Sequence, residues 1–414
     1  MILELHTLQN YPPHCLNRDD HGRPKSCDFG GVRRARISSQ CLKRAVRMQM
    51  RDVDQQAAHA VRSRRLIQDV LVPELRNAEL GLDPAEALKL SRFALAAAGL
   101  QSESDGTTQY LLFVPEQPVR RLAGVILEHA AGLTQAVELD KKGKAKLKKK
   151  LDGLAADAAA AMEAATEAVF KVDHTADLAL FGRMIADRPD RNIDGATQFA
   201  HAISTSEVAN SNDFFTAVDD LQRADSDEGS GAGMLGDVGF NSACFYGYTA
   251  VDAVGFHRNM NDGELTDDAA SITATLDALR RFLNAAVTAN PSAKQNSMSA
   301  QTRPSLVLAI AQAGQHQSLA NAFACPVDGG GGDLVERSAA ALLRHRARVR
   351  GVYGEAEGTR AFLIHTLDMA DLSAAEALET SADLAGLVDK LIGAAEASLA
   401  AAIEAEAALL DGVS

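Results

Sequence analysis

The sequence predicts an α+β fold whose core is interrupted by long helical insertions. Short runs with β-strand character occur at residues 1–8, 238–250 and 306–310, and helical patterns fill much of the chain between them. The chain has 414 residues and a hydrophobic fraction of 46%, enough for two or three structural units with sizeable cores. This composition excludes a disordered chain and a small protein held together by disulfides.

The N-terminal elements are expected to be a strand, a loop and a helix. Residues 1–8 are mainly apolar and predict a strand, whereas residues 10–31 are rich in Pro and Gly and predict a loop. Residues 38–51 predict a helix with Ser38 or Ser39 as its N-cap. Helical patterns at residues 52–100 and 118–170 then predict an inserted helical unit of about a hundred residues.

The second half of the chain is expected to return to the core and to leave it once. An apolar run at residues 178–185 predicts a strand. Residues 208–237 predict an excursion, because a mixed apolar and acidic segment leads into a flexible stretch rich in Gly, Ser and Asp. Residues 266–289 predict a helix, and a last helix over 373–408 would open with a capping box of Ser373 and Glu376.

Charge is separated along the chain. The formal net charge of -13 would argue against a nucleic-acid partner if it were evenly spread. Residues 17–51, however, hold ten basic side chains against three acidic ones, a local net charge of +7. Residues 371–414 hold nine acidic side chains against one lysine. The acidic total therefore hides a basic segment that suits a phosphate backbone.

The predicted helix over residues 38–51 concentrates this positive charge on one side. At about 100° per residue, its polar and basic side chains fall within one arc, opposite a mainly apolar face. We call this set the cationic ridge: Gln40, Lys43, Arg44, Arg47 and Arg51. Each cation could neutralise one phosphate, and the helix N-terminus could hold another. An ordinary solvated helix face remains the alternative.

A second basic segment is harder to interpret. Seven lysines lie within residues 141–150, with no arginine and no aromatic residue among them. A solvated helix or turn and a nonspecific nucleic-acid contact both fit this pattern.

The sequence offers no convincing catalytic constellation. Asp19 and Asp20 could bind a metal or act as a base, but adjacent acids in a loop also form turns or pair with nearby arginines. The histidines are scattered without metal-ligand spacing, and neither a nucleophile elbow nor a P-loop is present. We therefore expect a binding or scaffold protein, not an enzyme, with no metal and no cofactor.

Composition also bears on location. The five cysteines have no CxxC spacing, which is typical of a reducing cytoplasm. The N-terminus lacks the pattern of a signal peptide, and no apolar run approaches the roughly 20 residues that span a bilayer. A cytoplasmic protein with no membrane partner is the expectation.

A series of motifs resembles a known family. In chain order they are LNRDD (16–20), GGVRRARISSQ (30–40), LKRA (42–45), LFGRM (180–184), DGA (194–196), AHAIST (200–205), FTAVDDLQ (215–222), FYGY (245–248), AKQ (293–295) and SLANAF (318–323). Together they resemble CasC, the Cas-seven family of backbone subunits in type I-E CRISPR Cascade complexes. Residues 60–175, 223–234 and those after 350 match the family only in character.

The resemblance implies a particular fold. It implies a modified RRM, or ferredoxin-like, palm with an inserted helical fingers domain and a thumb hairpin. The implied boundaries are palm at 1–58, 178–204 and 239–414, fingers at 59–177 and thumb at 205–238, with a helical tail at the C-terminus.

The resemblance also implies partners. Several copies would stack along a crRNA and present it for pairing with target DNA, without catalysis by this chain. The further partners implied are the other Cascade subunits: the large subunit, the small subunit, the crRNA endonuclease and the subunit that binds the 5′ handle.

The same resemblance assigns site residues. The implied RNA contacts are Lys25, Ser38, Gln40, Lys43, Arg44 and Arg47, with Arg18, Arg33 and Arg34 as additions and Met184 near a kink in the RNA. The implied thumb residues, which would wedge against a base, are Phe215, Val218 and Leu235.

Two departures and one rival accompany the resemblance. The thumb carries an acidic, Gly-rich insertion at residues 224–233, and Val32 stands where the family can have a cation. The rival is a type III-like Cas-seven RNase that cleaves target RNA with Asp19 or Asp20.

Overall fold

The chain folds into two compact units. The computed structural model describes residues 1–77, 82–97, 99–139, 145–147, 152–172, 174–217, 234–328, 332–368 and 378–411. The first unit comprises Met1–Val53, Thr197–Ala253 and Leu276–Ser414, and the second comprises Asp54–Ala196 and Val254–Thr275. The finer division into palm, fingers and thumb stays a prediction.

A large, mostly antiparallel sheet forms the centre of the first unit. The strands that pair in succession are β14 (Glu379–Thr380), β13 (Arg360–His365), β12 (Leu306–Gln312), β1 (Ile2–His14), β11 (Met234–Asp252), β9 (Ala202–Ser204), β3 (Val32–Ile37) and β2 (Ser26–Phe29). Strands β8 (Thr197–Phe199) and β10 (Ser211–Ala217) also pair with β11. The strands expected near residues 1–8, 238–250 and 306–310 are therefore confirmed.

Both faces of this sheet are covered, and side chains alternate between them. On β1 and β11, the residues Leu8, Tyr246 and Tyr248 face helix α11 (Leu334–Tyr353), with which they form one buried cluster. The residues of opposite parity, such as Tyr11 and Phe245, face helix α1 (Ser39–Val53). The helix predicted over 38–51 is thus confirmed, and it lies directly on the sheet.

The second unit is mainly helical around its own apolar core. Its helices are α2 (Val72–Asn77), α3 (Pro84–Ala97), α4 (Glu116–Glu128), α5 (Ala130–Ala136), α6 (Gly153–Ala168), α7 (Ala176–Phe181), most of α8 (Ala253–Met260), and the short turns η1 (Ile67–Leu71) and η2 (Pro189–Arg191). Two small ribbons accompany them, β4 (Ala60–Ser63) with β5 (Leu112–Pro115) and β6 (Val137–Leu139) with β7 (Ala145–Leu147). The predicted helical insertion is confirmed in character.

The remaining helices of the chain are α9 (Ala269–Thr288), α10 (Gln295–Met298), η3 (Ala320–Phe323) and α12 (Leu384–Asp411). The helix expected over 266–289 corresponds to α9. Within the described residues, no helix has both the length and the apolar character needed to cross a bilayer.

Three predictions about elements were wrong. The expected loop at residues 10–31 contains the end of β1 and all of β2. The apolar run at 178–185 is mostly helix α7, which Gly182 ends at a φ of 73°, because a short apolar run cannot distinguish a buried strand from a buried helix. The last helix begins at Leu384, after strand β14, and the proposed capping residues Ser373 and Glu376 lie outside the described residues.

Candidate nucleic-acid interface

Helix α1 is fixed against the sheet by its apolar side and its first turn. Val46 and Met50 are buried, and Leu42 packs against the cluster that contains Ile37. Ser38 is the residue before the helix, and its Oγ accepts a hydrogen bond from the backbone N of Cys41 at 3.4 Å. The amide oxygen of Asn17 accepts from the backbone N of Ser38 at 2.8 Å. The polar face of α1 therefore has a defined direction.

The cationic ridge is only partly exposed. Gln40 and Arg44 are exposed, whereas Lys43 and Arg47 are half-buried. The Lys43 ammonium lies 5.7 Å from the centre of the Phe199 ring, and burial lowers the pKa of this lysine. Arg44 is thus the ridge cation that most plainly faces outward.

The two glycines before the ridge have a structural role. Gly30 and Gly31 connect β2 to β3 as a two-residue turn, with φ values of 65° and 83°. A Cβ atom at Gly30 would lie 1.6 Å from the carbonyl oxygen of Ala324. The space at Gly30 is therefore taken up by the chain's own backbone.

Arg34 is a correction to the predicted site. Its side chain is 0% exposed, and its guanidinium donates to the carbonyl oxygens of Phe29, Ser204, Thr205 and Phe323 at 2.7–3.3 Å. A group enclosed in this way cannot reach a phosphate. Arg34 instead ties the β2–β3 hairpin to β9 and to η3.

Arg33, its neighbour, points outward but is already paired. Its Nη1 atom donates to Asp28 Oδ1 at 3.2 Å, across the hairpin, and its side chain is 57% exposed. The pair is solvated, so it leaves Arg33 able to exchange its partner for a phosphate.

Cations gather near the start of α1. Arg36 Nη1 donates to His201 Nδ1 at 2.8 Å, and burial, Arg36 and Lys25 all lower the pKa of His201. Burial raises the pKa of the Cys41 thiol, while Lys25 and Arg44 oppose that rise. Lys25 therefore acts electrostatically both on His201, together with Arg36, and on Cys41, together with Arg44. Like charges in this region favour the binding of an anion.

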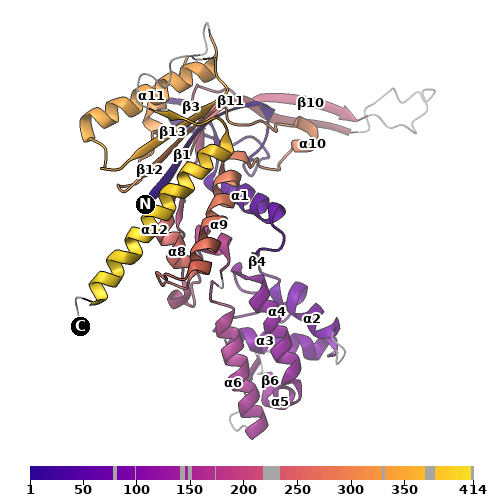
Figure 1. Cartoon of the computed structure of the whole chain (residues 1–414). Coiled ribbons are helices and arrows are strands. Elements are labelled where there is room, and N and C mark those ends of the chain that lie inside the picture. The colour runs from indigo at the N-terminus through magenta and orange to yellow at the C-terminus, as the bar shows by residue number, and fades with distance from the viewer. Residues whose placement is uncertain are drawn as a thin grey trace, which may run out of the picture. The chain divides into compact units, whose positions relative to one another are not determined.

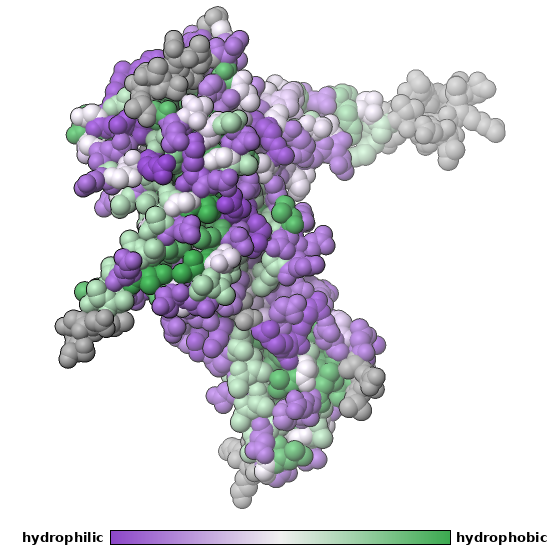
Figure 2. All heavy atoms as spheres, in the orientation of Figure 1, coloured by the Kyte–Doolittle hydropathy of each residue, from purple (hydrophilic) through white to green (hydrophobic). Residues whose placement is uncertain are grey.

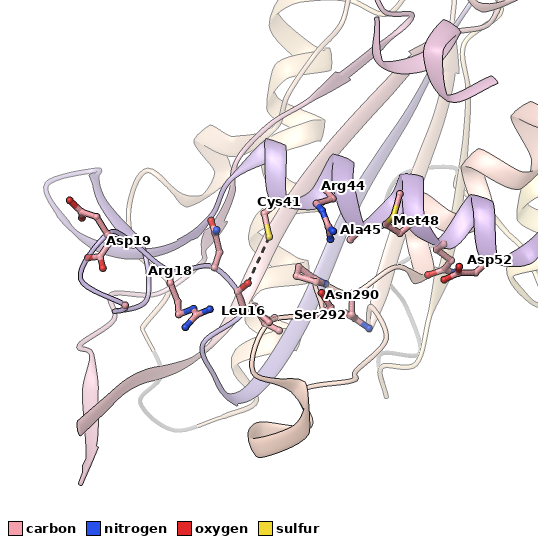
Figure 3. A pocket seen from close by; sticks show the side chains of 16 residues that line it. Leu16, Arg18, Asp19, Cys41, Arg44, Ala45, Met48, Asp52, Asn290 and Ser292 are labelled. Carbon is pink, nitrogen blue, oxygen red and sulfur yellow. Dashed lines mark hydrogen bonds between the residues drawn. The ribbon is translucent and has the colours of Figure 1, made fainter. Parts of the chain in front are cut away.

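Arg44 also lines a groove. The groove has a volume of about 960 Å³ and lies between residues 16–22, one side of α1 and residues 290–293. Figure 3 shows Arg44 in its middle part, by Asn290, with Arg18 between it and Asp19 at one end and Asp52 at the other end. The cations thus occupy the centre of the groove and the carboxylates its ends.

The side chain of Asp19 stabilises a turn. Its Oδ1 accepts from the backbone N atoms of His21 and Arg23 at 3.0 and 2.9 Å, and hydrogen bonding, mainly to Arg23, lowers its pKa. Within the described part of the chain, no cluster of His, Cys, Asp or Glu could hold a metal ion. The two hydrogen bonds give Asp19 a role in the turn.

Lys294 is a site residue that the sequence reasoning did not assign. It adopts left-handed backbone angles, with φ 56° and ψ 17°, directly before α10. Burial raises the pKa of the Cys15 thiol, and Arg18 and Lys294 both oppose this effect, which places the two cations near the same thiol. The sequence feature that could have identified Lys294 is the AKQ motif at 293–295. His201 lies in another such motif, AHAIST. We call Arg18, Lys25, Arg36, Arg44 and Lys294 the basic track.

A two-stranded ribbon extends from the sheet beside this track. Strand β10 pairs with the first part of β11, and Figure 1 shows the ribbon leaving the sheet. Every described residue of β10 is exposed, and Figure 2 shows apolar side chains among polar ones on the ribbon. The excursion predicted at residues 208–237 is confirmed as a hairpin, although residues 218–233 lie outside the described range.

The predicted wedge residues lie on opposite faces of this ribbon. Phe215 pairs with Gly236, and a Cβ atom there would lie 2.3 Å from the Phe215 ring, so glycine makes room for the aromatic side chain. Phe215 faces a cavity of about 620 Å³ that Lys294 and Met298 also line. Leu235 pairs with Thr216, which places it on the other face. Val218 lies outside the described residues.

Two further predicted features lie in the second unit. Met184 is 81% exposed and follows Arg183, whose backbone pairs with Ile193 in both directions. Of the lysine segment at 141–150, the structure describes only residues 145–147.

The comparisons with known proteins identify the family. The CT1975-like protein family matches residues 3–390, and the chain therefore belongs to it. One similar solved structure is a chain of a "CRISPR RNA-guided surveillance complex, pre-nicking", with a TM-score of 0.80 and 29% identity, over 95% of this chain and 100% of that chain.

A second solved structure, from a "CRISPR RNA-guided surveillance complex", has a TM-score of 0.70 and 24% identity over the same shares, and it shows the fold alone. None of the curated proteins matches. The resemblance to the Cas-seven backbone subunits is confirmed, whereas the type I-E subtype stays a prediction.

Proposed function

We propose that this chain is a crRNA-binding backbone subunit of a type I-E CRISPR Cascade surveillance complex. The observation that carries the proposal is the basic track, in which Arg18 and Arg44 line one groove and Lys294 lines the cavity beside the hairpin, in a chain whose family match covers residues 3–390. Several copies would stack along the guide in the cytoplasm, together with the other Cascade subunits. The guide would then pair with target DNA.

The chemistry of the track suits a phosphodiester backbone. Each cation neutralises one phosphate and releases counterions, and the positive end of the α1 dipole favours a further phosphate at the helix N-terminus. Contacts with phosphate carry no sequence information, so the protein would accept any guide. Base pairing alone would then select the target.

The exposed hairpin supplies the second part of the proposed mechanism. An apolar side chain that enters between two bases unstacks them at a cost of about a few kcal/mol. Phe215 lies on the face that shares a cavity with Lys294, next to the proposed path of the backbone. A wedge there would kink the guide at one position and leave the other bases stacked and displayed.

A direct test is a binding titration with the full chain. We expect single-stranded RNA to bind with a salt slope of about -0.7 per phosphate contact, so that the slope counts the cations engaged. Binding that is absent, or that does not respond to salt, would contradict the proposal.

The alternative function, target-RNA cleavage by Asp19 or Asp20, calls for its own assay. Matched RNA and magnesium would be incubated with the assembled complex that contains this chain. We expect the RNA to stay intact, because Asp19 is held by two backbone N–H groups. Cleavage that disappears in Asp19→Ala or Asp20→Ala would establish the RNase instead.

The two faces of the hairpin give a matched pair of variants. We expect Phe215→Ala to keep RNA affinity within about threefold, because the phosphate contacts remain. The regular pattern of nuclease protection along the RNA should nevertheless blur, because the wedge is gone. Leu235→Ala, on the opposite face, should keep the pattern. Unchanged periodicity in Phe215→Ala would refute the wedge.

RNA affinity should also depend on pH through His201. Arg36 and Lys25 help to lower the pKa of this histidine, and a bound phosphate would raise it again. Binding then takes up protons, so affinity should rise as the pH falls from 7.5 to 6. A rise of about half a pKa unit corresponds to roughly threefold once the pH lies below both pKa values, and to less between 7.5 and 6, because the pKa of free His201 already lies below its ordinary value. His201→Asn should flatten this dependence and His345→Asn, on α11, should not; the reverse result would exclude His201 from the site.

A further inference from the structure

Within the described residues, the C-terminal part of helix α12 is not covered by other elements of the first unit. The helix has 28 residues and contacts β12 and β13, and its buried side chains run from Leu387 to Leu399. From residue 400 to 409, every described side chain is exposed or half-buried, and Leu409 is 72% exposed. The family match ends at residue 390, within α12.

The outward side of α12 carries mainly acidic and small side chains. At about 100° per residue, Glu396, Ala400, Ile403, Glu404 and Ala407 fall within one arc, on the side away from the buried residues. We call this the tail face. Residues 400–411 contain three acidic residues and no Lys or Arg.

Helix α11 carries a face of opposite charge. Arg344, Ala347, Arg348, Gly351 and Val352 lie on one side of it, and all five are exposed. We call this the arginine stripe. Val352 and the adjoining Tyr353 are 74% and 81% exposed, which is unusual for large apolar and aromatic side chains. The small residues between the arginines leave room for a second helix to approach.

We propose that the tail face of one copy docks on the arginine stripe of the next copy. The two faces are complementary in charge, and the arginine stripe also carries the exposed Val352. Because the two faces differ, the contact is head-to-tail and leaves one free face of each kind on every pair, so it propagates along a filament. This inference rests on the proposed function, which places the copies side by side on one RNA.

A contact between one pair of helices does not need a high affinity by itself. A single pair of helices buries less than the roughly 1,000 Å² of a stable independent interface. Neighbours held on one RNA, however, meet at an effective concentration on the order of millimolar. The docking would therefore appear as cooperativity in filament assembly and not as a dimer in the absence of RNA.

Charge reversal on each face tests the inference. The stripe variant is Arg344→Glu with Arg348→Glu, and the tail variant is Glu396→Arg with Glu404→Arg. Each would be titrated on a long RNA, with mass photometry to count copies, and on an RNA too short for more than one copy. We expect each variant to need at least about fivefold more protein to fill the long RNA and to bind the short RNA as the natural chain does.

An equimolar mixture of the two variants separates docking between copies from docking within a chain. The stripe variant then offers an acidic stripe to the basic tail of the other variant, so pairs of adjacent copies should return on the long RNA. If the mixture stays as defective as either variant alone, the inference is overturned. If the natural chain fails to bind even the short RNA, the proposed function fails instead.

Discussion

The double variant Arg18→Ala and Arg44→Ala is expected to lose RNA binding on the order of a hundredfold near 0.1 M salt. Both side chains are exposed and both line the groove, so their removal should leave the fold intact. Each charge-assisted contact contributes roughly 1.5 kcal/mol, and two such contacts correspond to about a hundredfold in affinity. The magnitude of the salt slope should fall by about 1.4, because two fewer phosphates release their counterions into the solution when the protein binds.

A matched control removes the same charge elsewhere. Arg344→Ala with Arg348→Ala takes two exposed cations from α11, outside the groove. On an RNA too short for two copies, this control should keep both the affinity and the slope. Equal losses of RNA affinity in the two double variants would mean that net charge alone holds the RNA. The groove would then no longer be assigned as the RNA-binding site.

The second large effect concerns stability. Arg34→Met is expected to lower the free energy of unfolding of the first unit by about 3 kcal/mol or more. The guanidinium serves four carbonyl oxygens, and each buried polar group left without a partner costs about 1–3 kcal/mol. Arg34→Lys should recover only part of this loss, since an ammonium group cannot match the planar fork of donors.

The neighbouring residue provides the control for this variant. Arg33→Met changes an exposed side chain with one solvated partner and should alter stability by no more than about 0.5 kcal/mol. Calorimetry would give the stability, and hydrogen exchange in β3 and β9 would assign the transition to the first unit. If the two variants are equally stable, Arg34 is not a structural tie.

Arg33 and Arg34 also show why the sequence alone did not predict the site correctly. Arg33 and Arg34 both belong to the motif GGVRRARISSQ, and both were predicted to bind phosphate. They occupy successive positions of β3, so their side chains point to opposite faces of the sheet. That alternation could be used only if residues 32–37 were recognised as a strand, and the Pro- and Gly-rich segment before them concealed it.

Long-range packing accounts for other features that the sequence did not predict. Glu4 and His6 are fully buried in β1, where Glu4 accepts from Tyr248 Oη and the backbone N of Gln317, both at 2.6 Å. Burial raises the pKa of Glu4 and lowers that of His6 to about 3. The partners of these groups lie more than 200 residues away in the sequence, which a local pattern cannot reveal.

Other parts of the site could be predicted from the sequence because they depend on residues that are close together in the chain. The 100° rotation per residue predicted which side of α1 packs, and Val46 and Met50 are buried as expected. Ser38 was predicted as a cap from residue type alone and contacts the first turn. The cations at Arg36 and Lys294 join the track from other elements, so only the folded chain brings them together.

The central claim is that copies of this chain line up on RNA, and native mass measurement tests it most directly. The full chain would be mixed with RNAs of increasing length, and the number of bound copies would be counted for each. The account predicts one additional copy for every fixed increment of RNA length. A single copy at every length, or a mass that does not change when RNA is added, would contradict it.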